Sequence, residues 1–252
     1  MLTLHALTTG YRHTIISQHL NATLPQGTLT ALLGTNGAGK STLLRTLARF
    51  QPPLAGSISW QGTDTAQLSA RQLARTMSVV LTFKPEAEAL TAAEVVEMGR
   101  IPYTTMLSGT SEADRQAVEQ AMQLTHTTPF AHRPISTLSD GERQRVFIAK
   151  ALAQDTPVIL LDEPTAFLDF PAKIATMRLL KKLAHDAQKT ILLSSHDVEL
   201  ALHMADNLWL LNQQTLTSGS PQLLAANGCI GRFFNTEGVQ FDAATMRFDM
   251  RD

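Results

Sequence analysis

The sequence from 34 to 41 reads Gly-Thr-Asn-Gly-Ala-Gly-Lys-Ser and lies between an apolar run, Leu29 to Leu33, and a helical pattern, Ser41 to Phe50. Glycines at these positions let successive backbone N–H groups point at one phosphate chain, and the following helix adds its positive amino-terminal end. Lys40 then supplies a charge for the β- and γ-phosphates, and Ser41 a hydroxyl for Mg²⁺. Such a motif arises by chance in roughly one chain in a hundred of this length, so it needs support from other motifs.

A second apolar run, Val158 to Leu161, ends in the two carboxylates Asp162 and Glu163. A fully apolar run is typical of a strand buried on both faces of a parallel sheet. Ligands bind beyond the carboxyl ends of such strands, so we expect both acids beside the phosphate loop. Asp162 would hold Mg²⁺ directly or through water, and Glu163 would polarise the water that attacks the γ-phosphate. The alternative is that two acids merely end a strand.

A third stretch, Leu138-Ser139-Asp140-Gly141-Glu142, precedes an amphipathic segment from Arg143 to Gln154. Ser139 is therefore expected to cap a helix, which alone would explain the stretch. Together with the loop and the acidic strand end, however, the stretch resembles the signature motif of the ATP-binding cassette (ABC) ATPases. The resemblance extends over nearly the whole chain.

The resemblance assigns three further residues. Asp169 is similar to the D-loop aspartate, His196 to the switch histidine that steadies the γ-phosphate, and Tyr11 to the aromatic residue that stacks on adenine. A packed strand tyrosine and a structural histidine are the alternatives. The resemblance makes Glu163 and His196 the expected catalytic residues. The residues expected to bind ATP are Tyr11, Gly34, Thr35, Asn36, Gly37, Ala38, Gly39, Lys40, Ser41, Thr42, Ser139, Gly141 and Asp169, and those expected at Mg²⁺ are Ser41, Asp162 and Thr82.

Two positions depart from the commonest family pattern. The signature usually reads Leu-Ser-Gly-Gly-Gln, whereas here Asp140 and Glu142 place two carboxylates beside an anionic ligand, which would repel it. We expect Asp140 to turn toward solvent or toward Arg143 and Arg145. At the end of the expected strand 78–81 the family usually has a glutamine, and this chain has Thr82. Because threonine is shorter, a water is expected to bridge it to Mg²⁺.

The resemblance implies an α/β fold: a P-loop NTPase ABC cassette with a RecA-like core, an N-terminal antiparallel β part and an inserted helical subdomain. The chain is expected to be one domain, 1–252, with residues 1–82 and 156–252 as the nucleotide-binding core. Residues 83–155 would form the helical subdomain that ends in the signature helix. Capping signals at Thr91 and Ser111 predict helix starts in it. The pattern also predicts a long helix over 169–188 and a hairpin around 241–248.

Composition limits the remaining possibilities. The chain has 252 residues, 44% of them hydrophobic, and a single cysteine, Cys229. One cysteine cannot form an intrachain disulfide, and no apolar run reaches the roughly eighteen residues of a membrane span. No secretory leader is recognisable at the N-terminus. We therefore expect a cytoplasmic protein. A net charge of −1 with scattered Lys and Arg argues against nucleic acid as a partner.

The resemblance also implies partners. In the family each ATP lies between the loop of one cassette and the signature of another, so one chain alone cannot complete a site and a homodimer is expected. The motifs look most like importer cassettes for iron siderophores, haem and cobalamin. Such a cassette docks on separate permease subunits at the inner face of the membrane, which in turn receive cargo from a periplasmic or extracellular binding protein.

An iron chelate or haem is the leading cargo, cobalamin is the nearest alternative, and a non-transport ABC ATPase is a third possibility. Apolar residues of the helical insert would either dock the permease or pack the insert's own core, and the sequence favours neither. These residues are Phe83, Met98, Tyr103, Met106 and Leu107.

Overall fold

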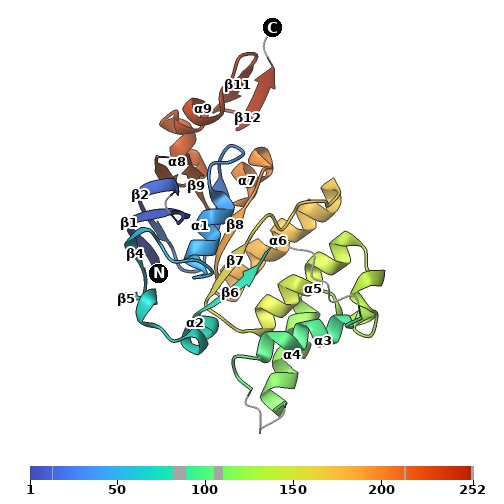
Figure 1. The fold of residues 1–252 in the computed structure, drawn as a ribbon. Helices are drawn as coiled ribbons and strands as arrows, with labels where there is room; N and C mark the ends of the chain where they lie inside the picture. Colours follow the sequence, from blue (N-terminus) through green and yellow to red (C-terminus); the bar gives the residue numbers. More distant parts are fainter. Residues whose placement is uncertain (13, 82–88, 105–109, 213, 251–252) are drawn as a thin grey trace. The chain divides into compact units, whose positions relative to one another are not determined.

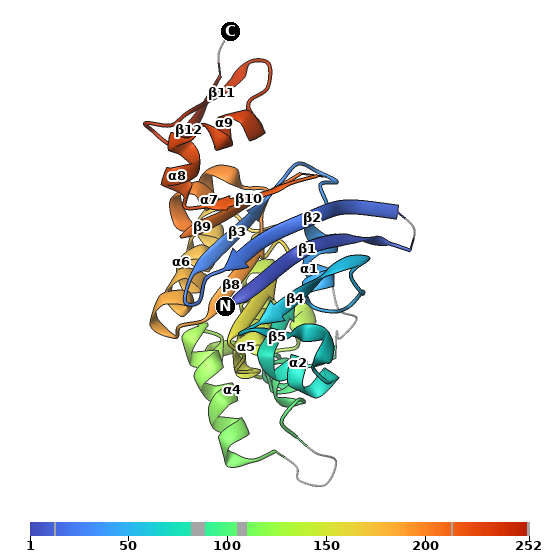
Figure 2. The same cartoon turned by 90° about the vertical axis from the view of Figure 1, so that its left-hand side faces the viewer.

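The computed structural model describes residues 1–252 except 13, 82–88, 105–109, 213 and 251–252 (Figures 1 and 2). The chain divides into two compact units, each described here by itself. The first unit comprises Met1–Ala66 and Leu180–Asp252, and the second comprises Gln67–Leu179. The boundary falls within α6 (Phe170–Asp186), the longest helix among the described residues. That helix matches the one predicted over 169–188.

The first unit begins with an antiparallel sheet in the strand order β2-β1-β4-β5. Its strands are β1 (Leu2–Tyr11), β2 (Thr14–Leu24), β4 (Ala55–Trp60) and β5 (Thr63–Asp64). The pairing of β1 with β2 shifts register three times between Leu4 and Gly10. Such bulges increase the local twist of a strand pair. The expected N-terminal antiparallel part is therefore confirmed.

The same unit holds a buried parallel ladder. Strand β3 (Leu29–Leu33) pairs in parallel with both β8 (Thr190–Ser194) and β9 (Asn207–Leu211), and β10 (Leu216–Gly219) pairs antiparallel with β9. Every residue of β3 and β8 is buried. This burial explains why their sequences read as continuous apolar runs rather than alternating ones.

Helices and a terminal hairpin complete the first unit. The helices are α1 (Lys40–Leu47), α7 (Val198–Met204), α8 (Pro221–Ala226) and α9 (Cys229–Phe234). Strands β11 (Val239–Asp242) and β12 (Arg247–Met250) form the predicted hairpin, with Phe241 opposite Phe248. The backbone N–H of Phe248 donates to Glu199 Oε1 of α7 at 3.0 Å, which ties the hairpin to that helix.

In the second unit, two parallel strands enclose a helical stretch in the sequence. Strand β6 (Met77–Val80) pairs with β7 (Val158–Leu161), and the elements described between them are all helical. The α-helices of the unit, besides the start of α6, are α2 (Ala70–Thr76), α3 (Ala92–Glu97), α4 (Glu112–Leu124) and α5 (Asp140–Ala153). Short 3₁₀ turns cover Thr65–Gln67 at the unit boundary, Met98–Arg100, Thr128–Phe130 and Ile135–Thr137. Helices α3 and α4 both pack against α5 (Figure 1).

The helix starts of this unit lie where the sequence predicted them. Thr91, Ser111 and Ser139 each accept a hydrogen bond from the backbone N–H three residues later, and each receives a return contact from an acidic side chain there. These reciprocal contacts are capping boxes, which satisfy two otherwise unpaired donors. The signature stretch is thus a helix start, as its N-cap reading required.

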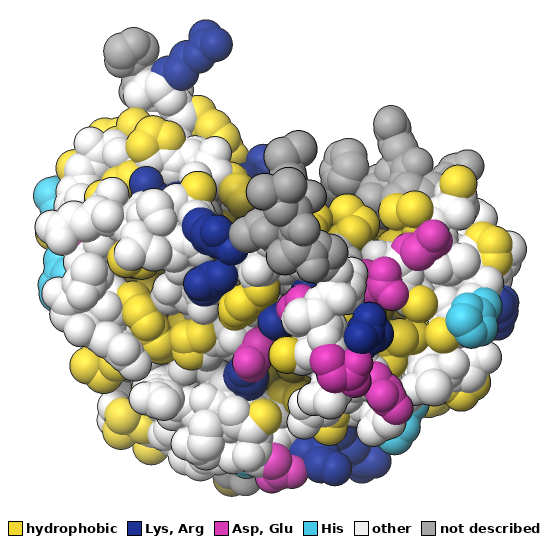
Figure 3. Space-filling model, turned by 90° about the horizontal axis from the view of Figure 1, so that it is seen from below, with side chains coloured by type: hydrophobic (Ala, Val, Ile, Leu, Met, Phe, Trp, Pro, Cys, Tyr) yellow, Lys and Arg dark blue, Asp and Glu magenta, His cyan; other side chains and the backbone are white. Residues whose placement is uncertain are grey.

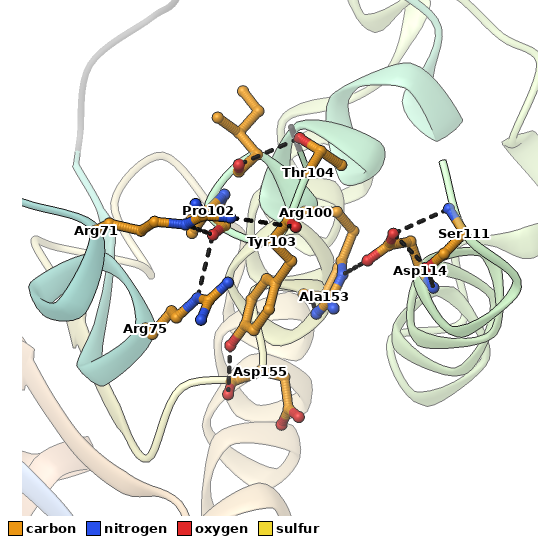
Figure 4. A network of polar contacts seen from close by, with 11 residues as sticks. Arg71, Arg75, Arg100, Pro102, Tyr103, Thr104, Ser111, Asp114, Ala153 and Asp155 are labelled. Atoms are coloured by element: carbon orange, nitrogen blue, oxygen red, sulfur yellow. Dashed lines mark hydrogen bonds and ion pairs between the residues drawn. The ribbon is translucent and has the colours of Figure 1, made fainter. Parts of the chain in front are cut away.

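A buried ion pair ties α4 to the Met98–Arg100 turn. Arg100 Nε donates to Asp114 Oδ1 at 2.9 Å, and both side chains are at least nine-tenths buried. Hydrogen bonds from the Ser111 hydroxyl, then from Arg100, lower the pKa of Asp114 to about 2. Figure 4 shows that Asp114 receives both of them. The carboxylate therefore joins the helix cap to the buried guanidinium.

Replacing the Asp114 carboxylate should make the free energy of unfolding less dependent on pH in the acidic range. A carboxyl group with a lowered pKa stabilises the fold above its unfolded pKa of about 4, and that contribution is lost as pH falls toward about 2. Asp114→Asn is expected to lower the free energy of unfolding by about 3 kcal/mol at neutral pH, with the difference shrinking toward pH ~3. Urea unfolding at several pH values measures it, with the exposed Glu119→Gln on the same helix as control. An equal loss of unfolding free energy at every pH would contradict an ionised Asp114 paired with Arg100.

Candidate nucleotide site

The loop between β3 and α1 turns through glycines with a left-handed backbone. Gly37 and Gly39 have φ angles of +78° and +98°, which side chains other than glycine rarely adopt. A Cβ built on Gly39 would lie 2.6 Å from Ile16 Cγ2, and one on Gly34 would lie 2.5 Å from the carbonyl oxygen of Leu211. Gly37 by contrast has no atom within 4 Å of such a Cβ, so the backbone is open there. The loop is therefore packed at two glycines and accessible at the third.

Lys40 begins α1 and folds back over this loop. Its Nζ donates to the carbonyl oxygens of Gly34 at 2.9 Å and Thr35 at 3.3 Å, and the residue is 6% exposed. Placing a cation at the first turn of a helix opposes the helix dipole, so the position is unfavourable unless an anion binds there. The ammonium group therefore lies against the carbonyl oxygens at the start of the loop.

Tyr11 and the helix after the loop are directly linked. The Tyr11 hydroxyl lies 3.2 Å from Thr42 Oγ1, while the tyrosine as a whole is 46% exposed. A strand tyrosine that merely packs into a core would be more deeply buried. The ring is therefore near the loop and open to a ligand, as adenine stacking would need.

His196 lies at the carboxyl end of a strand that is a neighbour of the loop's strand. It follows β8, which pairs with β3 up to Ser194 opposite Leu32, and the Ser195 N–H donates to the Leu32 carbonyl at 3.2 Å. The histidine is exposed, and Asp197 after it caps α7. The first unit thus contains the loop, Tyr11 and His196, and His196 follows a strand that pairs directly with the strand before the loop.

The acidic pair lies at the end of β7 in the second unit. The Asp162 N–H donates to the Val80 carbonyl at 2.8 Å, so the β6–β7 ladder continues up to this residue. Asp162 is 8% exposed. Glu163 has a φ of +51°, an uncommon conformation for a residue other than glycine. The backbone bends at this point, directly after the strand ends.

The signature carboxylates are both engaged by neighbours. Glu142 Oε2 accepts from the Ser139 N–H at 2.9 Å and lies 3.0 Å from its hydroxyl, and the first of these bonds is the main cause of a lowered Glu142 pKa. Arg133 lies 3.4 Å from the other oxygen of Glu142. Asp140 pairs with Arg143, as expected. An arginine therefore partly neutralises the negative charge of each carboxylate.

The D-loop position follows β7 and leads into α6. Asp169 accepts from the Ala172 N–H at 2.9 Å, so it caps α6. Phe167 and Phe170 flank it and are 78% and 68% exposed, two aromatic side chains that the sequence analysis passed over. Two phenylalanines within two positions of the expected D-loop aspartate were the signal that could have found them. A Cβ on Gly141 would lie 3.8 Å from Leu168, so the signature lies beside this segment.

Several predicted residues remain separate from these groups. Thr82, Phe83, Met106 and Leu107 lie outside the described residues. Met98 is 40% exposed, whereas Tyr103 is only partly exposed and its ring has arginine guanidinium groups over it. Met98 is therefore available to a partner, but the Tyr103 ring is largely occupied within the chain.

A parallel strand, a loop with left-handed glycines and a helix that begins with lysine define the P-loop NTPase class. The ABC transporter family model matches residues 17–166, more than half of the chain. The achromobactin transport ATP-binding protein CbrD of Dickeya dadantii is 38% identical over 94% of this chain and 88% of its own length. The probable siderophore transport system ATP-binding protein YusV of Bacillus subtilis is 38% identical over 86% and 79%.

Solved structures agree. An inward-facing putative metal-chelate type ABC transporter aligns with a TM-score of 0.78 and 30% identity, covering 88% of this chain and 84% of the other. The ATP-binding cassette MJ0796, in a dimeric post-hydrolysis state bound to ADP and Pi, aligns with a TM-score of 0.76 and 27% identity, covering 88% and 99%. The chain belongs to the ABC transporter family, as one of its ATP-binding, ATP-hydrolysing cassettes.

Proposed function

We propose that this chain is the ATP-hydrolysing subunit of an importer for an iron chelate, working with a separate permease. The observation that carries the proposal is a P-loop of the right backbone geometry in a chain that also holds one signature helix. CbrD and YusV, with transport names, support an import role, and the metal-chelate transporter supports the cargo class. No helix in the described part of the chain could span a membrane.

In this proposal the residues of the first unit hold the nucleotide. Lys40 and the loop amides bind the β- and γ-phosphates, and Tyr11 stacks on adenine, with Gly34, Gly37 and Gly39 shaping the loop. His196 steadies the γ-phosphate and the attacking water. The charge developing on the transferred phosphoryl group is met by fixed donors, which need no reorganisation during the reaction.

The second unit supplies the base and the metal ligand. Glu163 orients and polarises the attacking water, and Asp162 and Ser41 are the side chains that would hold Mg²⁺. Among the described residues no group of three or more His, Cys, Asp or Glu could hold a metal ion by itself. A cation bound by one carboxylate and one hydroxyl needs phosphate oxygens and water as further ligands, and this is the usual environment of Mg²⁺. Bound Mg²⁺ would neutralise phosphate charge.

The signature implies a second copy of the chain. A chain with one loop and one signature makes two equivalent ATP sites only as a head-to-tail homodimer, and the dimeric MJ0796 cassette supports this assembly. Ser139 and Gly141 of one copy, with the first N–H groups of α5, would meet the γ-phosphate bound by the other. Asp169 and its exposed aromatic neighbours would lie in the same contact. Hydrolysis removes that phosphate and so loosens the dimer.

The chain would work at the cytoplasmic face of a membrane, attached through its permease. On the face drawn in Figure 3, acidic and basic side chains lie next to one another. Nucleic acid binding favours a clustered basic face instead. The mixed charge therefore supports a protein partner.

Uptake measurements test the cargo. Cells lacking this chain are supplied with a labelled iron chelate, haem or cobalamin, and rescued with the wild type or with Lys40→Ala. Loss of iron-chelate uptake that only the wild type restores is the expected result. Loss of haem or cobalamin uptake alone would replace the cargo, and undiminished uptake of all three would contradict an import role for these classes.

The signature carboxylate gives a smaller, salt-dependent prediction. A unit charge about 4 Å from a phosphate in water-like surroundings costs about 1 kcal/mol, close to five-fold in affinity. Glu142→Gln keeps an acceptor for the Ser139 N–H and removes a charge that Arg133 partly offsets, so the ATP concentration for half-maximal turnover should fall about two-fold at low salt. The difference should vanish at high salt. Identical values at low salt would show that Glu142 does not face the nucleotide.

A further inference from the structure

Helix α5 has specific contacts at both of its ends. Its amino end is the signature, held by the Ser139–Glu142 capping box. Its carboxyl end packs against the Met98–Arg100 turn so closely that a Cβ on Gly99 would lie 2.4 Å from the Lys150 carbonyl oxygen. Only glycine permits this approach, so the turn and the last turn of α5 are in direct backbone contact.

Arg100 caps the carboxyl end of α5. Its Nη1 donates to the Ala153 carbonyl at 2.6 Å, while Nε binds Asp114 as described. A cation here pairs with a carbonyl at the end of the helix and interacts favourably with the partial negative charge of that end. Burying a guanidinium costs desolvation energy, and apolar residues of similar volume in the place of a buried ion pair often stabilise a fold equally well. The buried charge is therefore better explained by the fixed geometry it imposes than by stability.

Tyr103 holds the guanidinium in place. Its ring lies between Arg75 and Arg100, with guanidinium carbons 4.7 and 3.9 Å from the ring centroid (Figure 4). Arg71 Nε and Arg75 Nε both donate to the Pro102 carbonyl, at 2.9 and 3.1 Å. A planar guanidinium stacks on an aromatic face, which an ammonium group cannot do in the same way. Residues 100–103 therefore contact α2 through Arg71 and Arg75, and α5 through the bond from Arg100 to Ala153.

We propose that Arg100 is a positioning residue for ATP hydrolysis, which acts by fixing the carboxyl end of α5 and thereby the place of Ser139 at the opposite end. The inference rests on the proposed role of Ser139 at the γ-phosphate. Fourteen residues make a rod about 21 Å long, so a tilt of about 5° at the Ala153 end moves Ser139 by about 2 Å. Misplacement by about 1 Å can cost about a hundred-fold in rate.

Kinetics of purified variants test this inference. Arg100→Lys keeps the charge but loses the planar fork, and Tyr103→Leu keeps an apolar side chain at this half-buried position but removes the stack. Both are expected to lower kcat for ATP about ten-fold or more per folded molecule. The affinity for a fluorescent ADP, which reports the loop in the other unit, should stay within about two-fold. Tyr103→Phe keeps the ring and should retain turnover, which is a rescue that a general loss of packing would not give.

The matched control is Arg115→Lys on α4, where an exposed arginine pairs with Glu112 in a similar ion pair. It should leave kcat unchanged. Normal kcat per folded molecule in both Arg100→Lys and Tyr103→Leu would overturn the inference while leaving the proposed function intact. Tyr103→Phe as impaired as Tyr103→Leu would overturn the role of the stack. A wild type without hydrolysis would overturn the proposed function itself, and the inference with it.

Discussion

Glu163→Gln should slow ATP hydrolysis by about a hundred-fold or more while leaving ATP binding intact. Glutamine has nearly the same shape as glutamate but cannot accept the proton of the attacking water. The variant should therefore hold ATP unhydrolysed and persist as a dimer. Single-turnover hydrolysis measures the first effect, and light scattering of the ATP-bound protein measures the second.

The control for this variant is Glu237→Gln, at an exposed position near the terminal hairpin. It loses the same charge and should hydrolyse ATP at the wild-type rate. Rapid turnover by Glu163→Gln would remove this residue from the role of base. A slow variant that stays monomeric with ATP would retain that role and contradict the head-to-tail dimer.

Lys40→Ala is expected to weaken ATP binding by about ten- to a hundred-fold and to bring turnover below detection. Two losses combine, because the ammonium group binds the loop carbonyls of Gly34 and Thr35 and, in the proposed role, also supplies the charge for the phosphates. A fluorescent nucleotide titration measures the affinity. Lys182→Ala, an exposed change on α6, is the control and should bind normally. Unchanged affinity in Lys40→Ala would move the phosphate site away from this loop.

The sequence predicted the local features of the site well. The loop, the strand before it and the three helix caps each depend on residues within about four positions of one another, and spacing along the chain determines such contacts. The expected neighbours of Asp140 were also predictable, because Arg143 is one helical turn away. The family resemblance supplied the roles of Tyr11 and His196, which spacing alone would not have given.

Contacts between distant parts of the chain were not predictable. Arg100 reaches Asp114 on another helix and Ala153 at the end of α5, so no local pattern marks it as a buried cation. Tyr103 was expected either to dock a partner or to pack an apolar core. The structure instead places its ring among arginines, since the fold brings α2 beside the turn. Burial of charge depends on tertiary packing, which periodicity does not encode.

The left-handed backbone of Glu163 has a consequence for how this protein can evolve. A residue other than glycine in that region costs about 1–2 kcal/mol of stability. Glycine at this position would relieve the strain but would remove the proposed base. If Glu163 has that role, selection for stability and selection for hydrolysis act in opposite directions at this position. A more stable variant of the chain must therefore gain its stability at other positions, for example in helices away from the proposed nucleotide site.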